Sequence, residues 1–337
     1  MNHGLVESHA ERVPKLHRRR FLACMASSAV AAPVFAQPSA WPTRPIKLVI
    51  GYSPGGTGDG VARPVVEGLE RSLKQPIVMD YKPGASGLIA ADYLAKAPAD
   101  GYTIHMSDNG ALSIGPATRK LGYDPAAFTY LGSPGGLPLV LICSPKLPVT
   151  TLPELVAYVK SHPGTIDYAT GGVGGLPHLI AEQFKGLIHS DITHVPYKGL
   201  GAALPDLISG RVAFGFFGSI GVLGHVKSGS VRALAVTSAR RISQLPDVPT
   251  TAEGGFPQID STYQSAIIAP PGLPPQVEAQ LAAAVQQLTR DPQVVAGLEA
   301  GGFSIAPLSP AATKKLFQQE LLKWKALIVA NKLNLNE

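Results

Sequence analysis

A glycine-rich turn near the start of the chain has the residue types and spacing of a small-anion site. The apolar run at residues 46–50 has the length and branched side chains of a buried strand, and the turn at residues 52–59 follows it. We expect a helix to begin near Val61, with Asp59 as its N-cap. A strand, a glycine turn and a helix N-terminus direct several backbone N–H groups toward one point, which is how proteins bind small anions. The turn therefore predicts an anion-binding loop.

Two further turns repeat this pattern, at Asn109-Gly110 and at residues 171–175. The first turn does not fit a nucleotide-binding motif, because no Gly-Lys-Ser/Thr follows Gly55-Gly56 and the spacing does not match G-x-G-x-x-G. Ser53 lacks the setting of a nucleophile elbow, and the histidines lack metal-ligand spacing such as H-E-x-x-H. Three donor loops without a catalytic set predict a binding protein that is not an enzyme and uses neither a metal nor a cofactor. An exported hydrolase is the less favoured alternative, because Ser, His and Asp are all abundant.

Residues 1–36 have the layout of an export signal. Arg18-Arg19-Arg20 precedes a small apolar segment at residues 23–32, and Val34-Phe35-Ala36 resembles an A-x-A cleavage site. Two export routes are open, because Arg18-Arg19-x-Phe21-Leu22 is similar to a twin-arginine signal and a basic start also fits the general secretory route. In both cases we expect cleavage near Ala36 and an exported mature protein.

The composition argues against a nucleic-acid-binding protein. The chain has 29 Lys and Arg against 23 Asp and Glu, a net charge of +6, and removal of residues 1–36 lowers the charge to +3 (24 minus 21). Such a small and scattered excess does not fit a nucleic-acid surface. Cys143 is the one cysteine beyond the leader, and its apolar neighbours predict a buried thiol rather than a reactive one.

Strand-like and helix-like segments alternate along the rest of the chain, which predicts an α/β architecture with largely parallel sheets. We expect strands near residues 45–51, 76–80, 102–106, 138–143, 192–195, 212–217, 231–237 and 263–269. We expect helices near residues 61–73, 88–96, 153–161, 178–187, 201–209, 220–228, 275–288 and 310–331.

Two segments fit crossings between lobes, at residues 135–148 and at the proline-rich residues 262–275. A chain that leaves one lobe, builds a second and returns creates a cleft, and ligands of open α/β sheets bind beyond the carboxyl ends of the strands. We therefore expect lobe 1 at residues 41–137, lobe 2 at residues 138–267, and a return to lobe 1 with a C-terminal helix at residues 268–337.

An ordered set of motifs resembles one family of receptors. The set runs from about Trp41 to the C-terminus and includes Pro45-Ile46-Lys47-Leu48-Val49, Pro54-Gly55-Gly56, Lys82-Pro83-Gly84-Ala85, Ala97-Pro98-Ala99-Asp100-Gly101-Tyr102-Thr103, His194-Val195-Pro196-Tyr197-Lys198-Gly199 and Leu245-Pro246-Asp247-Val248-Pro249-Thr250. Together the motifs are similar to the substrate-binding proteins of tripartite tricarboxylate transporters, the Bug or TctC family.

The resemblance implies a two-lobed periplasmic binding protein of type II, with a ligand cleft between the lobes. Such a receptor closes on a small organic anion, usually a carboxylate, and delivers it to membrane permease subunits. An alternative output is a signal to a membrane sensor kinase, which would contact the same closed surfaces. We expect a monomer.

The resemblance also implies which residues contact the ligand. Loops matching residues 52–59 and 108–111 hold a carboxylate through backbone N–H groups and water, and loops matching residues 169–178 and 196–199 complete the site. The candidate ligand contacts are Tyr52, Ser53, Gly55, Gly56, Thr57, Asp59, Asp108, Asn109, Gly110, Ala111, Thr170, Gly174, Gly175, His178, Tyr197 and Lys198. Three of them have structural roles as alternatives to ligand contact: Asp59 and His178 as helix caps, and Lys198 as a solvent-exposed charge.

The chain departs from the family pattern where specificity is expected. Hydroxyl residues common near Gly175-Leu176-Pro177 are absent, as is a threonine near Ala111. Gln264-Ser265 replaces an aromatic pair, and Phe217-Gly218 replaces Asp-Asn. These changes predict a first lobe that keeps its carboxylate site and a second lobe suited to a less polar group. An aromatic or short aliphatic monocarboxylate is expected rather than citrate.

Overall fold

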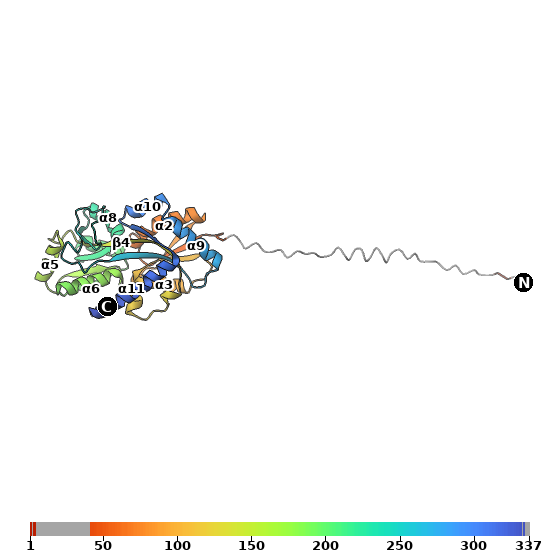
Figure 1. Ribbon diagram of the computed structural model, residues 1–337, viewed down its shortest axis with the longest axis horizontal. Coiled ribbons are helices and arrows are strands. Elements are labelled where there is room, and N and C mark those ends of the chain that lie inside the picture. Colours follow the sequence, from red (N-terminus) through yellow and green to blue (C-terminus); the bar gives the residue numbers. More distant parts are fainter. Residues whose placement is uncertain (2, 5–40, 332, 334–337) are drawn as a thin grey trace. The chain divides into compact units, whose positions relative to one another are not determined.

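The computed structural model describes residues 1, 3–4, 41–331 and 333. The arginines, the apolar segment and the cleavage site expected between residues 18 and 36 lie outside the described residues. Residues 42–337 form one structural unit, separate from residues 1–41. The fold is that of the described part of this unit (Figure 1).

Three parallel strands begin the fold. These strands lie in the order β2-β1-β3 and are β1 (Ile46–Ile50), β2 (Ile77–Tyr81) and β3 (Thr103–Asp108). They are joined by α2 (Thr57–Leu73) and by the short turn η1 (Ala85–Gly87) with α3 (Leu88–Ala95). Parallel strands have their carboxyl ends at one edge of the sheet, so the turns after β1, β2 and β3 lie near one another.

The longest strand, β4 (Thr129–Cys143), belongs to both halves of the sheet (Figure 1). Its first part pairs antiparallel with β9 (Thr262–Ala269) and β10 (Ser304–Leu308). Its last five residues pair antiparallel with β7 (Phe214–Gly218), and the same stretch pairs with β8 (Arg232–Val236). A side chain at Gly135 would meet the backbone of β10, because a Cβ there would lie 2.1 Å from the carbonyl oxygen of Ser304.

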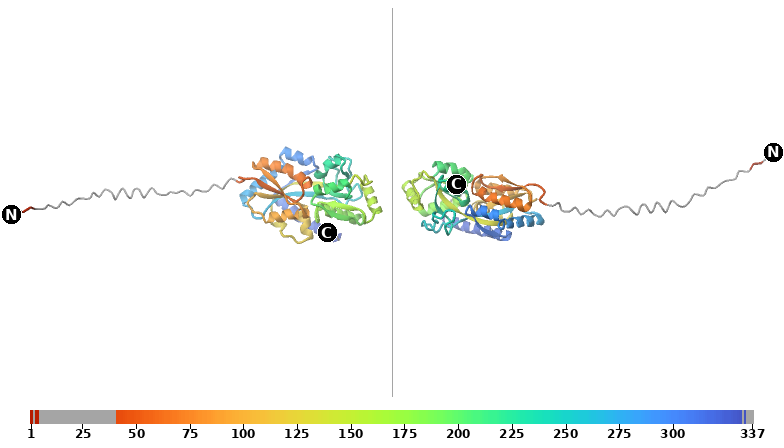
Figure 2. Two further views of the ribbon diagram at one scale, coloured as in Figure 1. Left: turned by 180° about the vertical axis from the view of Figure 1, so that it is seen from behind. Right: turned by 90° about the horizontal axis from the view of Figure 1, so that it is seen from above.

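The second half of the sheet continues from β7 with two parallel strands. β5 (Asp167–Thr170) pairs with β7, and β6 (Thr193–Pro196) pairs with the other edge of β5. The helices of this half are α5 (Leu152–Ser161), α6 (Leu176–Ile188), α7 (Leu200–Ser209) and α8 (Ser219–Lys227). Figure 2 shows these elements, mostly in green, gathered beside the orange and blue elements of the first half.

The chain then returns to the first half. β9 pairs antiparallel with β3, and the remaining helices are α9 (Pro275–Leu288), α10 (Pro292–Glu299) and α11 (Pro310–Ala330). α9 and α10 pack against α2, and α11 packs against β4 and the turn η2 (Gly110–Ile114). The short elements α4 (Gly115–Thr118) and η3 (Pro125–Ala127) connect η2 to β4.

Thr237 ties together the two segments that connect the halves. Its hydroxyl oxygen accepts a hydrogen bond from the Leu139 N–H at 3.0 Å and donates one to the Ser261 carbonyl at 2.7 Å. Leu139 lies where β4 changes its partners, and Ser261 immediately precedes β9. The two crossings are therefore held side by side by one buried side chain.

Every expected strand and helix overlaps an element of the structure, and the α/β class is confirmed. The expectation of largely parallel sheets is wrong, because β4 and β9 are antiparallel to each of their neighbours. The sequence analysis also missed β5, β10, α10 and the first part of β4. The stretch Gly132–Gly136 of β4 contains three glycines and a proline, a composition typical of a turn. The lobe boundaries given above stay a prediction.

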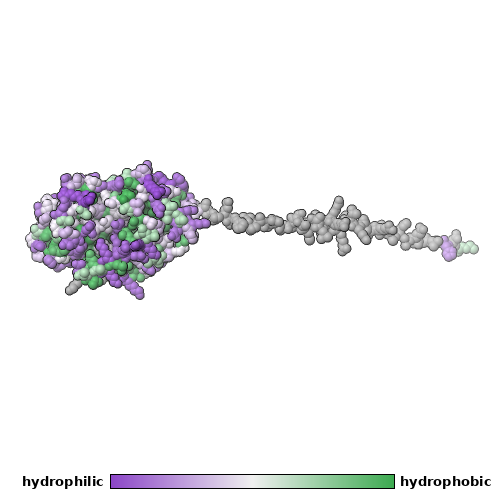
Figure 3. Space-filling model, viewed as in Figure 1, coloured by the Kyte–Doolittle hydropathy of each residue, from purple (hydrophilic) through white to green (hydrophobic). Residues whose placement is uncertain are grey.

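Cys143 is buried in the core, as the sequence predicts. Its thiol is free and fully buried, and burial raises its pKa to about 11, which makes the thiolate scarce at neutral pH. On the face shown in Figure 3, hydrophilic and hydrophobic side chains are interspersed. Among the described residues, no helix is both long and apolar enough to cross a membrane.

Phe184 of α6 is a central core residue of the second half. It is 1% exposed and packs edge-on against Phe214, Phe216 and Phe256, with ring centroids 6.1, 6.1 and 5.2 Å away. We expect Phe184→Ala to lower the free energy of unfolding by about 3–5 kcal/mol. The control Leu322→Ala removes a side chain that is 69% exposed and should change it by less than about 0.5 kcal/mol. Urea unfolding measures both, and equal losses would contradict the assignment of this core.

Candidate functional site

The first glycine turn has the expected strand-turn-helix geometry, but its helix begins earlier than predicted. α2 starts at Thr57 with Gly56 as its N-cap, so the prediction that Asp59 caps a helix near Val61 is wrong. Asp59 instead lies buried in the first turn, where one carboxylate oxygen accepts hydrogen bonds from the Gly55 N–H (3.1 Å) and the Arg63 Nε–H (3.0 Å). The other oxygen accepts from the Tyr81 hydroxyl. The buried Asp59 carboxylate therefore stabilises the first glycine turn.

A small cavity lies where the two halves meet. Its volume is about 30 Å³, room for roughly one or two water molecules. The residues that line it come from both halves and are Tyr52, Thr57, Gly58, Leu139, Gly171, Pro177, Gly199, Leu200, Phe217, Gly218 and Tyr263. Tyr52 fills much of the space, because a Cβ placed on Gly58, Gly171 or Gly199 would lie 3.2–3.7 Å from its side-chain atoms. A ligand of several heavy atoms requires wider separation of these walls.

Four helices begin at this cavity, and all four have glycine N-caps. The N-caps are Gly56 of α2, Gly175 of α6, Gly199 of α7 and Gly218 of α8, and none supplies a side-chain hydrogen bond to its helix. Of the helices that begin elsewhere, α5, α10 and α11 are capped by the side chains of Thr151, Asp291 and Ser309, whereas α3 and α9 also lack a side-chain cap. First-turn N–H groups have no acceptor within their own helix, so these four helices present unsatisfied donors and positive dipole ends to the cavity.

Direct contacts hold the two halves together around the cavity. The Ser53 N–H and hydroxyl both donate to the Lys198 carbonyl, at 2.9 and 2.8 Å. α7 lies so close to the first turn that a Cβ on Gly201 would be 2.2 Å from the Pro54 carbonyl oxygen. α8 approaches equally closely, because a Cβ on Gly218 would be 2.2 Å from the Thr57 Cγ2 atom. Glycines thus permit the close approach of the walls.

The carboxylate of Asp108, at the end of β3, occupies donors that the sequence analysis assigned to a ligand. Its Oδ1 accepts from the Gly110 N–H at 2.7 Å and its Oδ2 accepts from the Tyr263 hydroxyl at 2.6 Å. The Tyr52 hydroxyl and the Ala111 N–H also bond to it. Burial raises the pKa of Asp108, and these hydrogen bonds act in the opposite direction. The phenol pKa values of Tyr52 and Tyr263 are held well above the usual value, mainly by burial.

Asn109 connects three elements rather than facing the cavity. Its Oδ1 accepts from the Gln264 N–H of β9, and its Nδ2 donates to Glu320 of α11, both at 2.7 Å. Burial raises the pKa of Glu320 to about 7. The predicted ligand contact of Asn109 stays a prediction, and its side chain is used in holding the β3 end in place.

Two stacked histidines organise the glycine turn at residues 171–175, in the second half of the sheet. His178 and His194 have ring centroids 3.9 Å apart. His178 Nδ1 accepts from the Gly174 N–H at 3.1 Å, and His194 Nε2 is 2.7 Å from the Thr170 hydroxyl. Burial, then the neighbouring His194, lowers the pKa of His178 to about 3, so His178 is neutral at physiological pH. The pair shapes the loop that leads into α6.

Tyr197 and Lys198 of the β6–α7 turn point away from the cavity or into solvent. The Tyr197 hydroxyl donates to Asp206 Oδ2 at 2.7 Å, and Lys198 is exposed.

Of the predicted contacts, Tyr52 and Thr57 line the cavity. The lining residues Gly58, Gly171, Pro177 and Gly199 lie within the predicted loops but were not candidate contacts. Five further lining residues were missed: Leu139, Leu200, Phe217, Gly218 and Tyr263. The signal for Pro177 and Leu200 is that both follow a glycine turn at the start of a helix.

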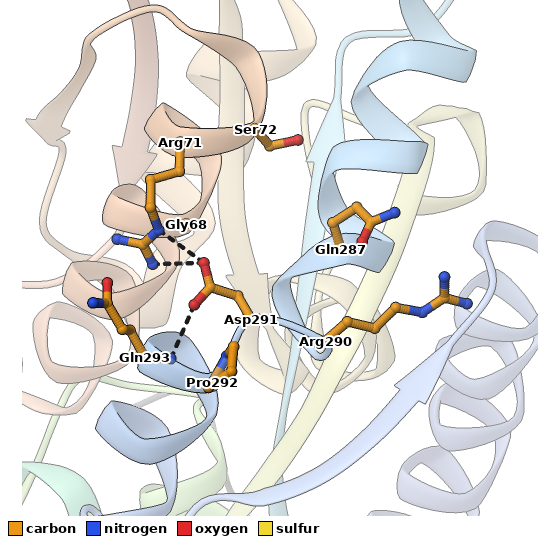
Figure 4. A pocket seen from close by; sticks show the side chains of 8 residues that line it. All are labelled: Gly68, Arg71, Ser72, Gln287, Arg290, Asp291, Pro292 and Gln293. Carbon is orange, nitrogen blue, oxygen red and sulfur yellow. Dashed lines mark hydrogen bonds and ion pairs between the residues drawn. The ribbon is translucent and has the colours of Figure 1, made fainter.

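A larger depression of about 710 Å³ lies on the surface of the first half, between the ends of α2 and α9 and the start of α10 (Figure 4). Its Arg71 and Asp291 side chains form an ion pair at 2.7 Å, and Asp291 also caps α10. Figure 4 shows the Arg290 side chain pointing away from that pair. This trough is open, and its Arg71 and Asp291 side chains already bind each other, so the enclosed cavity is the better candidate site. Among the described residues, no group of three or more His, Cys, Asp or Glu is arranged to hold a metal ion.

Comparison with known proteins agrees with this geometry. Residues 61–335 match the model of the tripartite tricarboxylate transporter family receptor. The chain belongs to this family. It is 34% identical to BugT of Bordetella pertussis over 310 residues, which cover 90% of this chain and 94% of BugT.

Solved structures of receptors of this kind share the fold. An R. palustris protein with adipate is 33% identical, with a TM-score of 0.83 over 87% of this chain and 98% of that protein. MatC from Rhodopseudomonas palustris with bound malate is 29% identical, with a TM-score of 0.80 over 86% of this chain and all of that protein. The resemblance to the Bug or TctC family and the two-lobed binding-protein fold are thus confirmed.

The close approach of α7 to the first turn generates a test of closure. We expect Gly201→Ala to keep the lobes apart, because the added methyl group collides with the Pro54 carbonyl, while the helix itself gains up to about 1 kcal/mol. Small-angle X-ray scattering should show a larger radius of gyration. The control Gly224→Ala adds a methyl group on α8 with nothing within 4 Å and should leave it unchanged. Identical scattering from both variants would contradict the tight closure described here.

The raised pKa of Glu320 predicts that the free energy of unfolding depends on pH. With a pKa raised from 4.5 to about 7, the folded state keeps a proton that the unfolded state has lost, so stability falls as pH rises from about 4.5 to about 7. We expect Glu320→Gln to match the wild type at low pH and to be more stable near pH 8, by at most about 3 kcal/mol. Urea unfolding at both pH values measures this. The exposed control Glu299→Gln should show no such divergence, and parallel curves for both variants would contradict the burial of Glu320.

Proposed function

We propose that this chain is a periplasmic solute receptor that binds a small organic carboxylate between its lobes and delivers it to the permease of a tripartite tricarboxylate transporter. The observation that carries the proposal is the convergence of four helix N-termini with glycine N-caps on one cavity. A bound carboxylate supplies the acceptors that these helices lack. The adipate and malate of the two similar structures support the same class of ligand.

The energetics are sufficient for such a ligand. A hydrogen bond to a charged group contributes roughly 1.5–3 kcal/mol, and a micromolar complex requires about −8 kcal/mol. Each helix N-terminus adds about 0.3–1 kcal/mol of favourable electrostatics for an anion. Three or four backbone donors can therefore reach micromolar affinity against the cost of association.

The cavity walls favour a ligand with an apolar body. Leu139, Pro177, Leu200 and Phe217 supply apolar surface from the second half and from β4. We propose an aromatic or short aliphatic monocarboxylate as the ligand, because this surface offers few partners for additional carboxylates. The site holds no evident nucleophile and base, so we also propose that the protein is not an enzyme. Export with cleavage near Ala36 would bring the receptor to the periplasm.

A thermal-shift series tests the ligand class. We expect benzoate and butyrate to raise the melting temperature of the mature protein more than citrate does, with adipate and malate between them. Stabilisation by polycarboxylates alone would overturn the monocarboxylate assignment. A series in which no carboxylate stabilises the protein would overturn the carboxylate receptor itself. Turnover of generic ester or phosphate substrates, absent in a heat-denatured control, would overturn the proposal that it is not an enzyme.

A further inference from the structure

We propose that Asp108 takes up a proton when a carboxylate enters the cleft, so that the Tyr263 hydroxyl redirects its own proton from Asp108 to the ligand. The inference rests on the proposed function and deepens it. Asp108 becomes the residue that determines at which pH this receptor binds an anion.

The hydrogen-bond geometry gives the first argument. A phenol has one proton to donate, and the Tyr263 hydroxyl donates it to Asp108 Oδ2, at 2.6 Å. The Tyr52 hydroxyl is also bonded to Asp108. Both tyrosines line the cavity, and while Asp108 is ionised their phenol protons are directed to Asp108. The ionised carboxylate of the ligand can only accept hydrogen bonds, and neither phenol has a proton left to donate to it.

Charge gives the second argument. An anion that touches the Tyr263 oxygen lies within about 6 Å of the Asp108 carboxylate, because each of the two hydrogen-bond lengths is below about 3 Å. At an effective dielectric constant of about 20, repulsion at that distance weakens binding by roughly a hundredfold. The described residues lining the cavity include no Lys, Arg or His to offset it. The helix N-termini attract the ligand but leave this repulsion in place.

One proton from solvent removes both obstacles. Asp108 Oδ2–H then donates to the Tyr263 oxygen, and the Tyr263 O–H is free to donate to the ligand carboxylate. Asp108 Oδ1 continues to accept from the Gly110 N–H, so the turn is undisturbed. No covalent bond other than the O–H bonds changes. Burial already raises the pKa of Asp108, so the proton is taken up more readily than by an exposed aspartate.

Other titratable groups lie around Asp108. Tyr52, Tyr263 and Tyr123 have raised pKa values and stay protonated near neutral pH. His105, also on β3, is buried with its pKa lowered to about 4 and stays neutral. Glu320 contacts the neighbouring Asn109 and has a pKa raised to about 7, so it titrates in the range of the experiment. It therefore requires its own control.

Isothermal titration calorimetry tests the inference on the wild-type mature protein. Benzoate, butyrate and adipate are titrated from about pH 6.5 to about pH 8.5, in buffers with different ionisation enthalpies. We expect uptake of about one proton per bound ligand and a Kd that rises roughly tenfold per pH unit. Binding of any of these probes with no proton uptake and a constant Kd would overturn the inference and leave the receptor function intact.

Three variants locate the proton. Asp108→Asn can donate permanently to the Tyr263 oxygen, so it should bind the same probe independently of pH and at least tenfold more tightly than wild type near pH 8.5. Glu320→Gln should keep the wild-type pH dependence, and its loss there would overturn the assignment to Asp108. Tyr263→Phe removes the donor and should weaken binding about tenfold near pH 6.5. Absence of binding to wild type and to Asp108→Asn at every pH would instead overturn the proposed function, and this inference with it.

Discussion

Backbone N–H groups that have no partner within their own helix are the constraint around which this protein is arranged. A helix start ordinarily satisfies these groups with a side-chain cap, as α5, α10 and α11 do through Thr151, Asp291 and Ser309. The four helices at the cavity have glycine instead. Glycine leaves the donors open and also removes the Cβ atoms that would hold the walls apart. One residue type thus leaves donors available for the anion proposed above and permits the close approach of the walls.

Asp108 shows how the backbone donors of another turn, the one after β3, are satisfied within the protein. Its carboxylate accepts hydrogen bonds from the turn that follows β3 and from two tyrosines that line the cavity. An internal acid of this kind stabilises the turn in the closed arrangement. It also makes the site different from a simple cradle of backbone donors, because the protein places a carboxyl group of its own beside the tyrosines that line the cavity.

The sequence was most informative where local chemistry determines structure. The apolar run of β1, the glycine turn after it and the resemblance to the family led to the α/β class and to Tyr52 and Thr57 in the cavity. It was least informative where distant partners decide. Asp59 looks like a helix cap locally, but its partner Tyr81 lies 22 residues away and draws it inside the protein. The glycine-rich start of β4 looks like a turn, and only its pairing with β9 and β10 makes it a strand. Tyr263 could not be placed beside Asp108, 155 residues away, by any local pattern.

The two hydrogen bonds of the Thr237 hydroxyl have a consequence for how the lobes move relative to each other. The Thr237 side chain binds both crossings, at Leu139 and Ser261, and β4 pairs directly with β9 beside it, so we expect the two connections to move together. Two adjacent, paired connections favour a hinge rotation over independent movement of each connection. We expect such a rotation to separate the two lining surfaces together and to bring them back together on closure. For the receptor function proposed above, we therefore expect recognition to depend on the alignment of these two lining surfaces on closure.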